Sequence, residues 1–531
     1  MPADDDHLKR IAGLEKRIAQ LERELAEVQL SARRSAVQQA LMDERLLTLE
    51  RNRLFRLWDK AYRAAANLYG RIGSDKRYGG LSDLRTPGDY TRWVNREQHE
   101  FLAEDHRGAM DRWQIRPKIS VVVQSGDYSL ADQCYSNWEL CRESDRPTGE
   151  YVLLLHAGDR LSPHALYFYA EALQNDAPDL VYADEDRIDG DGNRAQPLFK
   201  PKWSPELLAS TAYPGRAVLY RTGLDHPTRA CHIPRVLYHA AARPPIEMMT
   251  RSYVAPSGAR LSLVICSRHP GRVRECLQLV RGTAVLPIEV LVVHHIESHD
   301  GEEMRQCVQR FGGTWIPYRG PFNFAAMNNM AAAKSTSPYL LFMNDDVIVP
   351  ERGWDEVLAT TLAQPEIGVA GVILEYPNGT IQHAGVVVGM GDAAGHCGRF
   401  QMTSDLWPWL RMSRDVSAVT GAMLGIRAEL FQQMRGFDEA FPVNYNDVDL
   451  CLRVRQSGLR VVCLNAGKVI HREAQTRIGG TRHDERDALY RRWAYVLARS
   501  DEFYSRHLAP TERIALVTEV SGGRPLEALM C

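Results

Sequence analysis

The chain repeats itself over a long distance, and this duplication constrains the fold more than any single motif. Each copy alternates short apolar runs of strand length with helix-like segments, a pattern typical of α/β domains. We therefore predict two related α/β domains in tandem, at residues 118–245 and 255–500. The matched segments are KISVVV (118–123) and RLSLVI (260–265), GEYVLLLHAGDRLSP (149–163) and SPYLLFMNDDVIVP (337–350), GRAVLYRTGL (215–224) and GAMLGIRAEL (421–430), and RVLYH (235–239) and GKVIH (467–471).

The segments outside the two copies are predicted to differ in secondary structure. Residues 1–70 show a helical pattern that begins with about three heptads of a coiled-coil seam, and arginines follow it. This helix can join two copies of the protein, pack on its own chain or contact anionic lipid, and the sequence leaves these alternatives open. Residues 71–117, which carry several Gly residues and a Pro-Gly pair, are predicted to be a linker, and residues 501–531 a C-terminal tail. The seam consists of Ile11, Leu14, Ile18, Leu21, Leu25 and Val28.

Composition removes several classes of protein from consideration. Among 531 residues, 65 Lys and Arg side chains nearly balance 67 Asp and Glu side chains, so nothing in the charge favours nucleic acid as a partner. The ten cysteines form no Cys-x-x-Cys pair and the opening residues show no secretory apolar segment, which predicts a cytoplasmic protein. No run of about twenty apolar residues is present, so membrane contact is expected only at the inner surface of the cell membrane.

An acidic triplet interrupts the apolar run PYLLFMNDDVIVP at residues 338–350. The run predicts a buried strand, and Asn344, Asp345 and Asp346 then stand at its carboxyl end, where open α/β sheets bind ligands. Asn and Asp also favour ordinary turns. The triplet by itself therefore fits either a ligand site or a solvated turn.

Six blocks of the second copy follow one another in a characteristic order. Together they resemble the family 2 glycosyltransferases, particularly bacterial enzymes of O-antigen and rhamnose-rich polysaccharide assembly. The resemblance implies a GT-A type nucleotide-binding α/β sandwich. It also implies inverting transfer of a sugar, with rhamnose as one candidate, from a nucleotide-sugar donor to a glycan or lipid-linked glycan. The blocks are GPFNFAAMNNMAAA (320–333), MNDDV (343–347), YPNGTIQHAG (376–385), VSAVTGAMLGIR (416–427), GFDEAF (436–441) and NDVDLCLR (446–453).

The resemblance assigns the acidic triplet to the donor side of the site. Asp346 matches the family's metal-binding carboxylate best, with Asn344 and Asp345 beside it in the DXD-like motif. A divalent cation, Mg2+ or Mn2+, held by carboxylate oxygens would neutralise the diphosphate leaving group. His471, at the end of another apolar run, is expected to be a third metal ligand or to bind the phosphates, and a structural histidine is the alternative.

The resemblance places Asp447 at the family's catalytic aspartate, where it would accept the proton of the acceptor hydroxyl. From the residues alone, Asp447 also suits a helix N-cap, because NDVDLCLR opens an amphipathic segment. Gly421 is expected to let the backbone approach the sugar closely, or else to serve a turn. His383, in the QHAG block, matches the family but receives no role.

The second copy departs from the family pattern beside the nucleotide. Family members usually carry an aspartate after the second strand, whereas this chain has His294 and His295 there. We expect His294 to hydrogen-bond an edge of the donor base in place of that aspartate.

The first copy is shorter, and its acidic triplet is reduced to Asp159. Ser262 to Asp346 spans 84 positions, but the matching Ser120 to Asp159 spans 39, so 45 residues are missing there. We expect the missing parts to include the second strand, much of the nucleotide pocket and the counterpart of Asp447. This copy should therefore be catalytically inactive.

Two hypotheses follow for the whole chain. In the first, the second domain is an active glycosyltransferase. In the second, the chain is an inactive glycosyltransferase-like scaffold that recruits or orients an active transferase. The joint retention of Asp346, Asp447 and His471 favours the enzyme.

Overall fold

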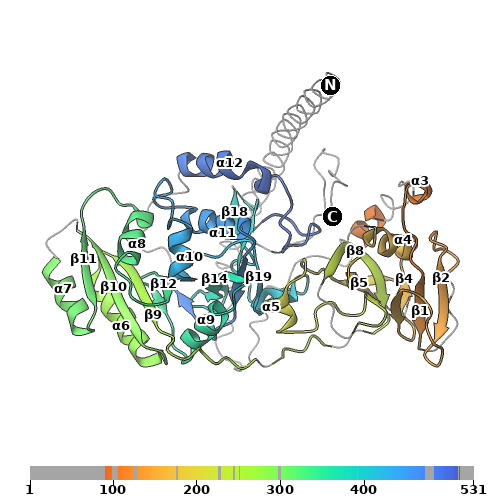
Figure 1. Ribbon diagram of the computed structural model, residues 1–531, viewed down its shortest axis with the longest axis horizontal. Coiled ribbons are helices and arrows are strands. Elements are labelled where there is room, and N and C mark those ends of the chain that lie inside the picture. Colours follow the sequence, from red (N-terminus) through yellow and green to blue (C-terminus); the bar gives the residue numbers. More distant parts are fainter. Residues whose placement is uncertain are drawn as a thin grey trace, which may run out of the picture.

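The computed structural model contains two α/β domains joined in tandem (Figure 1). The predicted coiled coil at residues 1–70 lies outside the described residues. Within the described residues, none of the helices is long and apolar enough to cross a membrane. The structure describes residues 90–97, 106–124, 128, 130–174, 177–189, 191–224, 229–242, 245–249, 251–296, 301–391, 393–472, 483–511 and 514.

The first domain is built on an eight-stranded mixed sheet with the order β2-β1-β3-β7-β5-β8-β4, in which β6 also pairs with β5. Helix α4 (Ala165–Ala172) covers one face and buries nearly all of its side chains. Helices α3 (His106–Asp111) and α5 (Pro205–Leu208) are short. The strands are β1 (Ile119–Val123), β2 (Trp138–Arg142), β3 (Tyr151–Leu155), β4 (Arg160–Leu161), β5 (Leu180–Ile188), β6 (Arg194–Leu198), β7 (Val218–Arg221) and β8 (Ala230–Ala240).

The second domain is built on an eight-stranded sheet with the order β11-β10-β9-β12-β20-β14-β21-β19. A small sheet, β13-β22-β15-β16, and the hairpin β17-β18 lie beside it. The strands are β9 (Leu261–Ser267), β10 (Ile288–His295), β11 (Thr314–Tyr318), β12 (Tyr339–Met343), β13 (Val347–Ile348), β14 (Ile367–Val372), β15 (Leu374–Glu375), β16 (Ile381–His383), β17 (Val386–Val388), β18 (Ala394–His396), β19 (Arg414–Asp415), β20 (Met423–Arg427), β21 (Arg460–Leu464) and β22 (Ile470–His471). The helices are α6 (Pro270–Thr283), α7 (Gly301–Arg310), α8 (Phe324–Ala332), α9 (Trp354–Leu362), the 3-10 helix η1 (Pro408–Arg411), α10 (Ala428–Gln433), α11 (Asn446–Gln456) and α12 (His483–Leu497).

The two sheets share one strand order, so the predicted α/β duplication is present in the fold. The run β2-β1-β3-β7-β5-β8 corresponds to β10-β9-β12-β20-β14-β21, and neighbouring strands have the same relative directions in both. The expectation that the first copy lacks its second strand is wrong, because β2 pairs with β1 in parallel. Among the described residues, the first domain instead lacks counterparts of α6, α7, β11 and α8. Strand β2 escaped detection because it is an edge strand with mostly unburied side chains, so no apolar run marks it.

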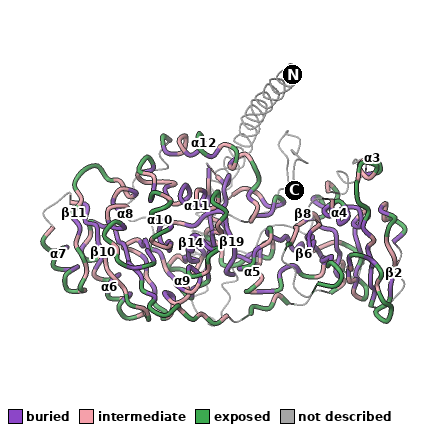
Figure 2. Tube along the Cα trace, in the orientation of Figure 1, coloured by how far each residue is buried: buried purple, intermediate pink, exposed green. Residues whose placement is uncertain are grey.

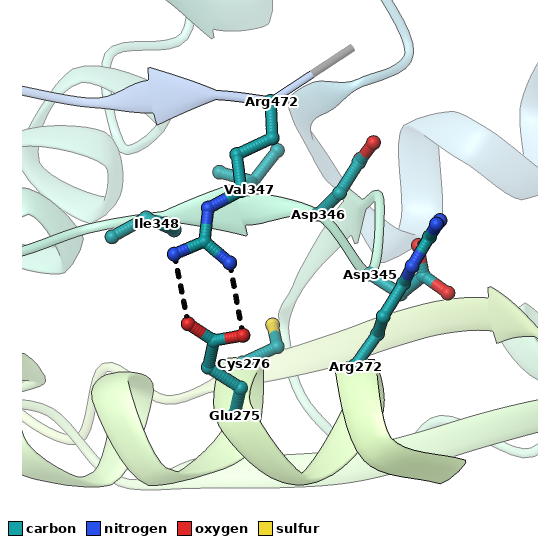
Figure 3. A pocket seen from close by; sticks show the side chains of 8 residues that line it. All are labelled: Arg272, Glu275, Cys276, Asp345, Asp346, Val347, Ile348 and Arg472. Atoms are coloured by element: carbon teal, nitrogen blue, oxygen red, sulfur yellow. Dashed lines mark hydrogen bonds and ion pairs between the residues drawn. The ribbon is translucent and has the colours of Figure 1, made fainter. Parts of the chain in front are cut away.

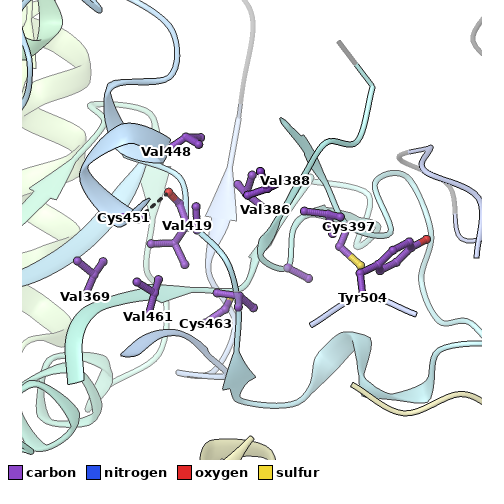
Figure 4. Close-up of a cluster of buried hydrophobic side chains, with 14 of the residues drawn as sticks. Val369, Val386, Val388, Cys397, Val419, Val448, Cys451, Val461, Cys463 and Tyr504 are labelled. Carbon is purple, nitrogen blue, oxygen red and sulfur yellow. Dashed lines mark hydrogen bonds between the residues drawn. The ribbon is translucent and has the colours of Figure 1, made fainter. Parts of the chain in front are cut away.

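One hydrophobic core continues from the first domain into the second (Figure 2). Tyr213 of the first domain and Trp409 of the second are both almost fully buried, with ring centroids 6.1 Å apart. Figure 4 shows part of the same core around Val419, Cys451 and Val461, next to α11. Separate cores cover the other face of each sheet.

Part of the predicted linker is helical and packed into this shared core. Residues 90–97 form a helix in which Trp93 stacks on Tyr90 and meets Phe199 edge to face. Gly and Pro suggested little regular structure here, but two large aromatic side chains bury enough area to anchor a short helix. At the other end of the chain, residues 501–511 also reach the core, although the sequence indicated a tail from residue 501.

Candidate active site

The acidic triplet lies where the sequence places it. Strand β12 is buried throughout, and Asn344, Asp345 and Asp346 form a turn directly after its carboxyl end. Because β12 runs parallel to β9, this turn lies at the carboxyl edge of the central sheet. The backbone then enters β13, whose Val347 pairs with His471 of β22.

The pairing of β13 with β22 brings His471 to Asp346. His471 Nε2 lies 3.1 Å from Asp346 Oδ1, and Asn344 Nδ2 lies 3.4 Å from the same nitrogen. Burial opposes ionisation of Asp346, but the hydrogen bond and positive charge of His471 outweigh it and hold the pKa of this carboxyl below its ordinary value. An ionised carboxylate therefore faces an imidazole at the sheet edge.

This pair fits a small divalent cation. Neighbouring ligands of an octahedral ion at about 2.1 Å are about 3 Å from each other, close to the separation of His471 Nε2 and Asp346 Oδ1. Among the described residues, the other ring nitrogen of His471 is buried and has no hydrogen-bond partner. In the part of the chain that the structure describes, no three His, Cys, Asp or Glu side chains converge as a metal site. Asp346 and His471 would thus supply two ligands, and donor phosphates and water the rest.

Asp345 points to a different neighbour. It accepts a hydrogen bond from Ser267, and Arg272 of α6 lies 4.0 Å away. Burial, with the negative charge of Asp346 adding to it, raises the pKa of Asp345. A small surface pocket, partly open to solvent, adjoins these groups, and Figure 3 shows Arg272 beside Asp345 at its wall. The pocket is lined by Arg272, Glu275, Cys276, Asp345, Asp346, Val347, Ile348 and Arg472.

Asp447 lies in the first turn of α11 and contacts the loop that precedes β20. Its Oδ2 accepts a hydrogen bond from the Gly421 amide at 2.7 Å, and its Oδ1 accepts one from Val448 at 2.8 Å. The N-cap position belongs to Tyr445, which makes no side-chain capping bond. Asp447 therefore does not act as the N-cap, and its carboxylate is fixed against a loop of the central sheet.

Gly421 connects Asp447 to the acidic triplet. Strands β12 and β20 are antiparallel with Met343 opposite Met423, and the Asn344 amide donates to Ala422 O at 3.0 Å. A Cβ on Gly421 would stand 3.6 Å from Asp447 Oδ2. The structure thus brings Asn344 and Asp346, His471, Gly421 and Asp447 to one edge of the sheet, although Asp447 does not line the pocket of Figure 3.

His383 is a further site residue to which the sequence gave no role. It is fully buried, and its Nε2 accepts from the amides of Gly385 at 3.3 Å and Thr420 at 3.5 Å. Its Nδ1 lies 3.0 Å from Nδ1 of His396, and burial lowers its pKa far below the ordinary histidine value. Consecutive amides of Thr420 and Gly421 therefore hold His383 and Asp447. The QHAG motif was the only sequence signal for this residue.

His294 stands apart from that group. It is the last residue but one of β10, which is separated from β12 by β9, and its side chain is buried against Trp315, whose Nε1 donates to His294 Nδ1 at 3.4 Å. The position at the carboxyl edge agrees with a base-binding role, and the ring also contacts Trp315. Its role stays a prediction.

The first domain carries residues at positions equivalent to Asp346 and His471. Arg160 pairs with His239 as Val347 pairs with His471, which places Asp159 at the position of Asp346. Asp159 is completely buried and accepts from Arg216 Nη1 at 2.8 Å and from Tyr238 at 2.6 Å. His239 turns instead to Asp186, 2.6 Å away. The Arg216 guanidinium thus pairs with the Asp159 carboxylate, which a metal cation at this position would need as a ligand.

Comparison with known proteins assigns the second domain to a class. Its sheet-edge carboxylates, imidazole and α/β fold are those expected of a nucleotide-sugar transferase domain. Residues 258–495 match the family model described as glycosyltransferase like family 2, and this part of the chain belongs to that family.

Two curated relatives resemble the chain over a longer stretch. The O-antigen biosynthesis protein RfbC of Myxococcus xanthus is 31% identical over 493 residues, covering 77% of this chain and 37% of that protein. An uncharacterized protein, y4gI, of Sinorhizobium fredii (strain NBRC 101917 / NGR234) is 27% identical over 452 residues, covering 71% of this chain and 49% of that protein. The chain therefore spans less than half the length of these relatives.

Similarity to solved structures is weaker. The crystal structure of GalNAc-T7 with UDP, GalNAc and Mn2+ aligns with a TM-score of 0.35 at 12% identity, covering 44% of this chain and 48% of that chain. The mannosyltransferase PcManGT from Pyrobaculum calidifontis, in complex with GDP-Man and Mn2+, aligns with a TM-score of 0.31 at 13% identity, covering 47% and 76%. The family assignment rests on the sequence match.

Proposed function

We propose that the protein is an inverting glycosyltransferase that adds a sugar from a nucleotide donor to a bacterial surface polysaccharide or O-antigen precursor. The observation that carries this proposal is the meeting of Asp346, His471 and Asp447 at one sheet edge, through the loop at Gly421. The relative named for O-antigen biosynthesis supports the polysaccharide, and rhamnose is a candidate sugar.

Asp447 is the proposed catalytic base. An alcohol is a weak nucleophile while protonated, and a carboxylate held at two oxygens by amides can take the proton without changing its position. The deprotonated acceptor oxygen attacks the anomeric carbon from the side opposite to the nucleotide, which inverts the configuration. Gly421 leaves room for the sugar because a side chain there would stand against Asp447.

Asp346 and His471 are the proposed ligands of a divalent cation, and Asn344 orients His471. When bound, the ion would neutralise charge on the departing diphosphate. Arg272, beside Asp345 in the pocket, supplies a further positive charge on the donor side. His294 is proposed to contact the base of the nucleotide.

The acceptor is proposed to be a glycan or lipid-linked glycan, with the protein at the cytoplasmic face of the membrane. Oligomerisation through residues 1–70 stays a prediction. The domain bounds 118–245 and 255–500 are proposed as the two units, with catalysis confined to the second.

The proposal is tested by donor hydrolysis and transfer assays on the full chain with a panel of nucleotide sugars and Mn2+. Asp447→Asn should lower kcat by about 10²–10⁴-fold, the usual contribution of a positioned base, with donor binding retained. Asp449→Asn is the matched control, because Asp449 is buried against Arg453, Arg492 and Trp493 and has no proposed part in the chemistry. Should the wild-type chain turn over no nucleotide sugar, the alternative of an inactive scaffold that orients another transferase would stand.

A further inference from the structure

The first domain touches the second at the segment that leads into the candidate active site. Asp415 of β19 is almost fully buried, and its Oδ2 accepts from Ser204 Oγ at 2.7 Å and from the Glu206 amide at 3.2 Å. The Asp415 amide donates back to Ser204 Oγ at 3.0 Å. Ser204 and Glu206, at the start of α5, thus both hydrogen-bond Asp415 of the second domain.

Two further contacts attach the neighbouring residues. Trp409 Nε1 donates to Phe199 O at 2.8 Å, and Ser210 Oγ donates to Ser413 O at 3.4 Å. The donor and acceptor residues of both hydrogen bonds are buried or half-buried, so water competes little for these bonds. Residues 409–415 are therefore held by the first domain along most of their length.

Arg460 of the second domain completes the buried charge cluster. Its Nε and Nη2 donate to Asp415 at 2.7 and 3.1 Å, and it lies 3.9 Å from Glu206. A carboxylate buried at this depth is stabilised only while these donors stay in place. The contact is consequently specific in position, unlike an exposed ion pair.

From Asp415 the chain continues directly to the loop that contacts the proposed base. Residues 415–419 are all buried and are fixed on the way by Val416 N, which donates to Val461 O at 2.9 Å, and by Ala418 O, which accepts from Val386 N at 2.8 Å. Figure 4 shows Val419 packed among Val461, Cys451 and their neighbours. The segment then presents the Thr420 amide to His383 and the Gly421 amide to Asp447.

We propose that the catalytically inactive first domain is a positioning element for the active site of the second, acting through the Ser204–Asp415 contact on residues 415–421. The proposal rests on the function proposed above, with Asp447 as the base. It gives the inactive copy a defined part: α5 fixes the loop whose Gly421 amide orients the Asp447 carboxylate. A small displacement of such a loop costs rate even when it lies far from the chemistry.

The test compares full-length Ser204→Ala and Asp415→Asn with Lys202→Ala. Lys202 is the control because it also links the domains, to Glu502, but through an exposed ion pair rather than a buried one. Both test variants should lower kcat by about tenfold with the KM for the donor little changed. Because both variants alter the Ser204–Asp415 contact, the effect of the double variant should be smaller than the product of the two single effects. Lys202→Ala should behave as wild type.

Hydrogen exchange supplies a readout that needs no activity. In Ser204→Ala and Asp415→Asn, the amides of Thr420 and Gly421 should exchange faster than in wild type and in Lys202→Ala. Exchange that accelerates only within residues 409–415, or a rise in acceptor KM at constant kcat, would overturn the proposal. If wild type proves inactive, the proposed function fails, while the exchange experiment still decides whether the first domain fixes the loop. If Asp415→Asn does not fold, Ser204→Ala alone carries both measurements.

Discussion

Replacing Arg216 by alanine tests whether a side chain has taken the place of a cation in the first domain. Asp159 is completely buried and Arg216 is 23% exposed, so the substitution leaves a buried carboxylate without its countercharge. Removing one partner of a buried ion pair costs about 3–5 kcal/mol. Tyr238 and the Ala241 amide still donate to Asp159, which places the expected loss at the lower end, about 3 kcal/mol.

The double variant gives the sharper expectation. With Asp159→Asn added to Arg216→Ala, the uncompensated charge disappears while both neighbouring donors keep a polar partner. The double variant should therefore be more stable than Arg216→Ala alone, by about 1–2 kcal/mol. If the two substitutions acted independently, their losses in the free energy of unfolding would instead add.

Urea unfolding followed by circular dichroism measures these differences, and hydrogen exchange at the Ala241 amide locates them in the first domain. Arg221→Ala is the control, because Arg221 is 41% exposed and 3.9 Å from Asp179, so its loss should cost less than about 1 kcal/mol. If Arg216→Ala is no more destabilising than Arg221→Ala, Arg216 is not the countercharge of Asp159 and the reasoning fails.

Three further expectations follow from the packing. Gly421→Ala should keep the melting temperature but lower the rate of sugar transfer, because the new Cβ would lie 3.6 Å from its neighbours, Asp447 among them. Gly371→Ala should lower the free energy of unfolding by about 1–3 kcal/mol, because its Cβ would lie 2.5 Å from Val419. Thermal-shift and turnover assays distinguish the two effects. Burial lowers the pKa of His507 far below 6.5, so at this residue the unfolded chain binds more protons than the folded chain below that pH. Between pH 7 and pH 5.5, His507 should therefore lower the free energy of unfolding by about 1 kcal/mol. A His507→Gln variant whose stability depends on pH as the wild type's does would contradict this. Burial raises the pKa of Cys451 to about 12, so a disulfide reagent at pH 8 should label this thiol only after unfolding, as peptide mapping would show.

The sequence predicted those parts of the site that depend on a local pattern of apolar and polar residues. A buried strand that ends in Asn344, Asp345 and Asp346 can be recognised from the change between apolar and polar residues, and the α/β fold then fixes which edge of the sheet they occupy. The repeat also matched Asp159 with Asp346 and His239 with His471, and the strand pairing places these residues at equivalent positions in the two domains.

The parts that escaped prediction depend on contacts between distant segments. Nothing near Asp415 in the chain indicates that Ser204 is its partner, and the charge of Arg216 gives no sign that it points inward to Asp159. The 90–97 helix escaped for a related reason, because Trp93 gains its burial from Phe199 of another segment. Periodicity reports which face of an element is apolar, but not what will cover it.

The two copies differ in what surrounds the carboxylate that they share. Aligning β7 with β20 places Arg216 opposite Ala422, the residue whose carbonyl accepts from the Asn344 amide. In the second domain this position carries only a methyl group, and Asp346 contacts His471 instead. In the first, a guanidinium fills the same place and satisfies Asp159 from within. The internal cation lets the buried carboxylate of Asp159 contribute to stability, whereas we propose that the carboxylate of Asp346 serves binding.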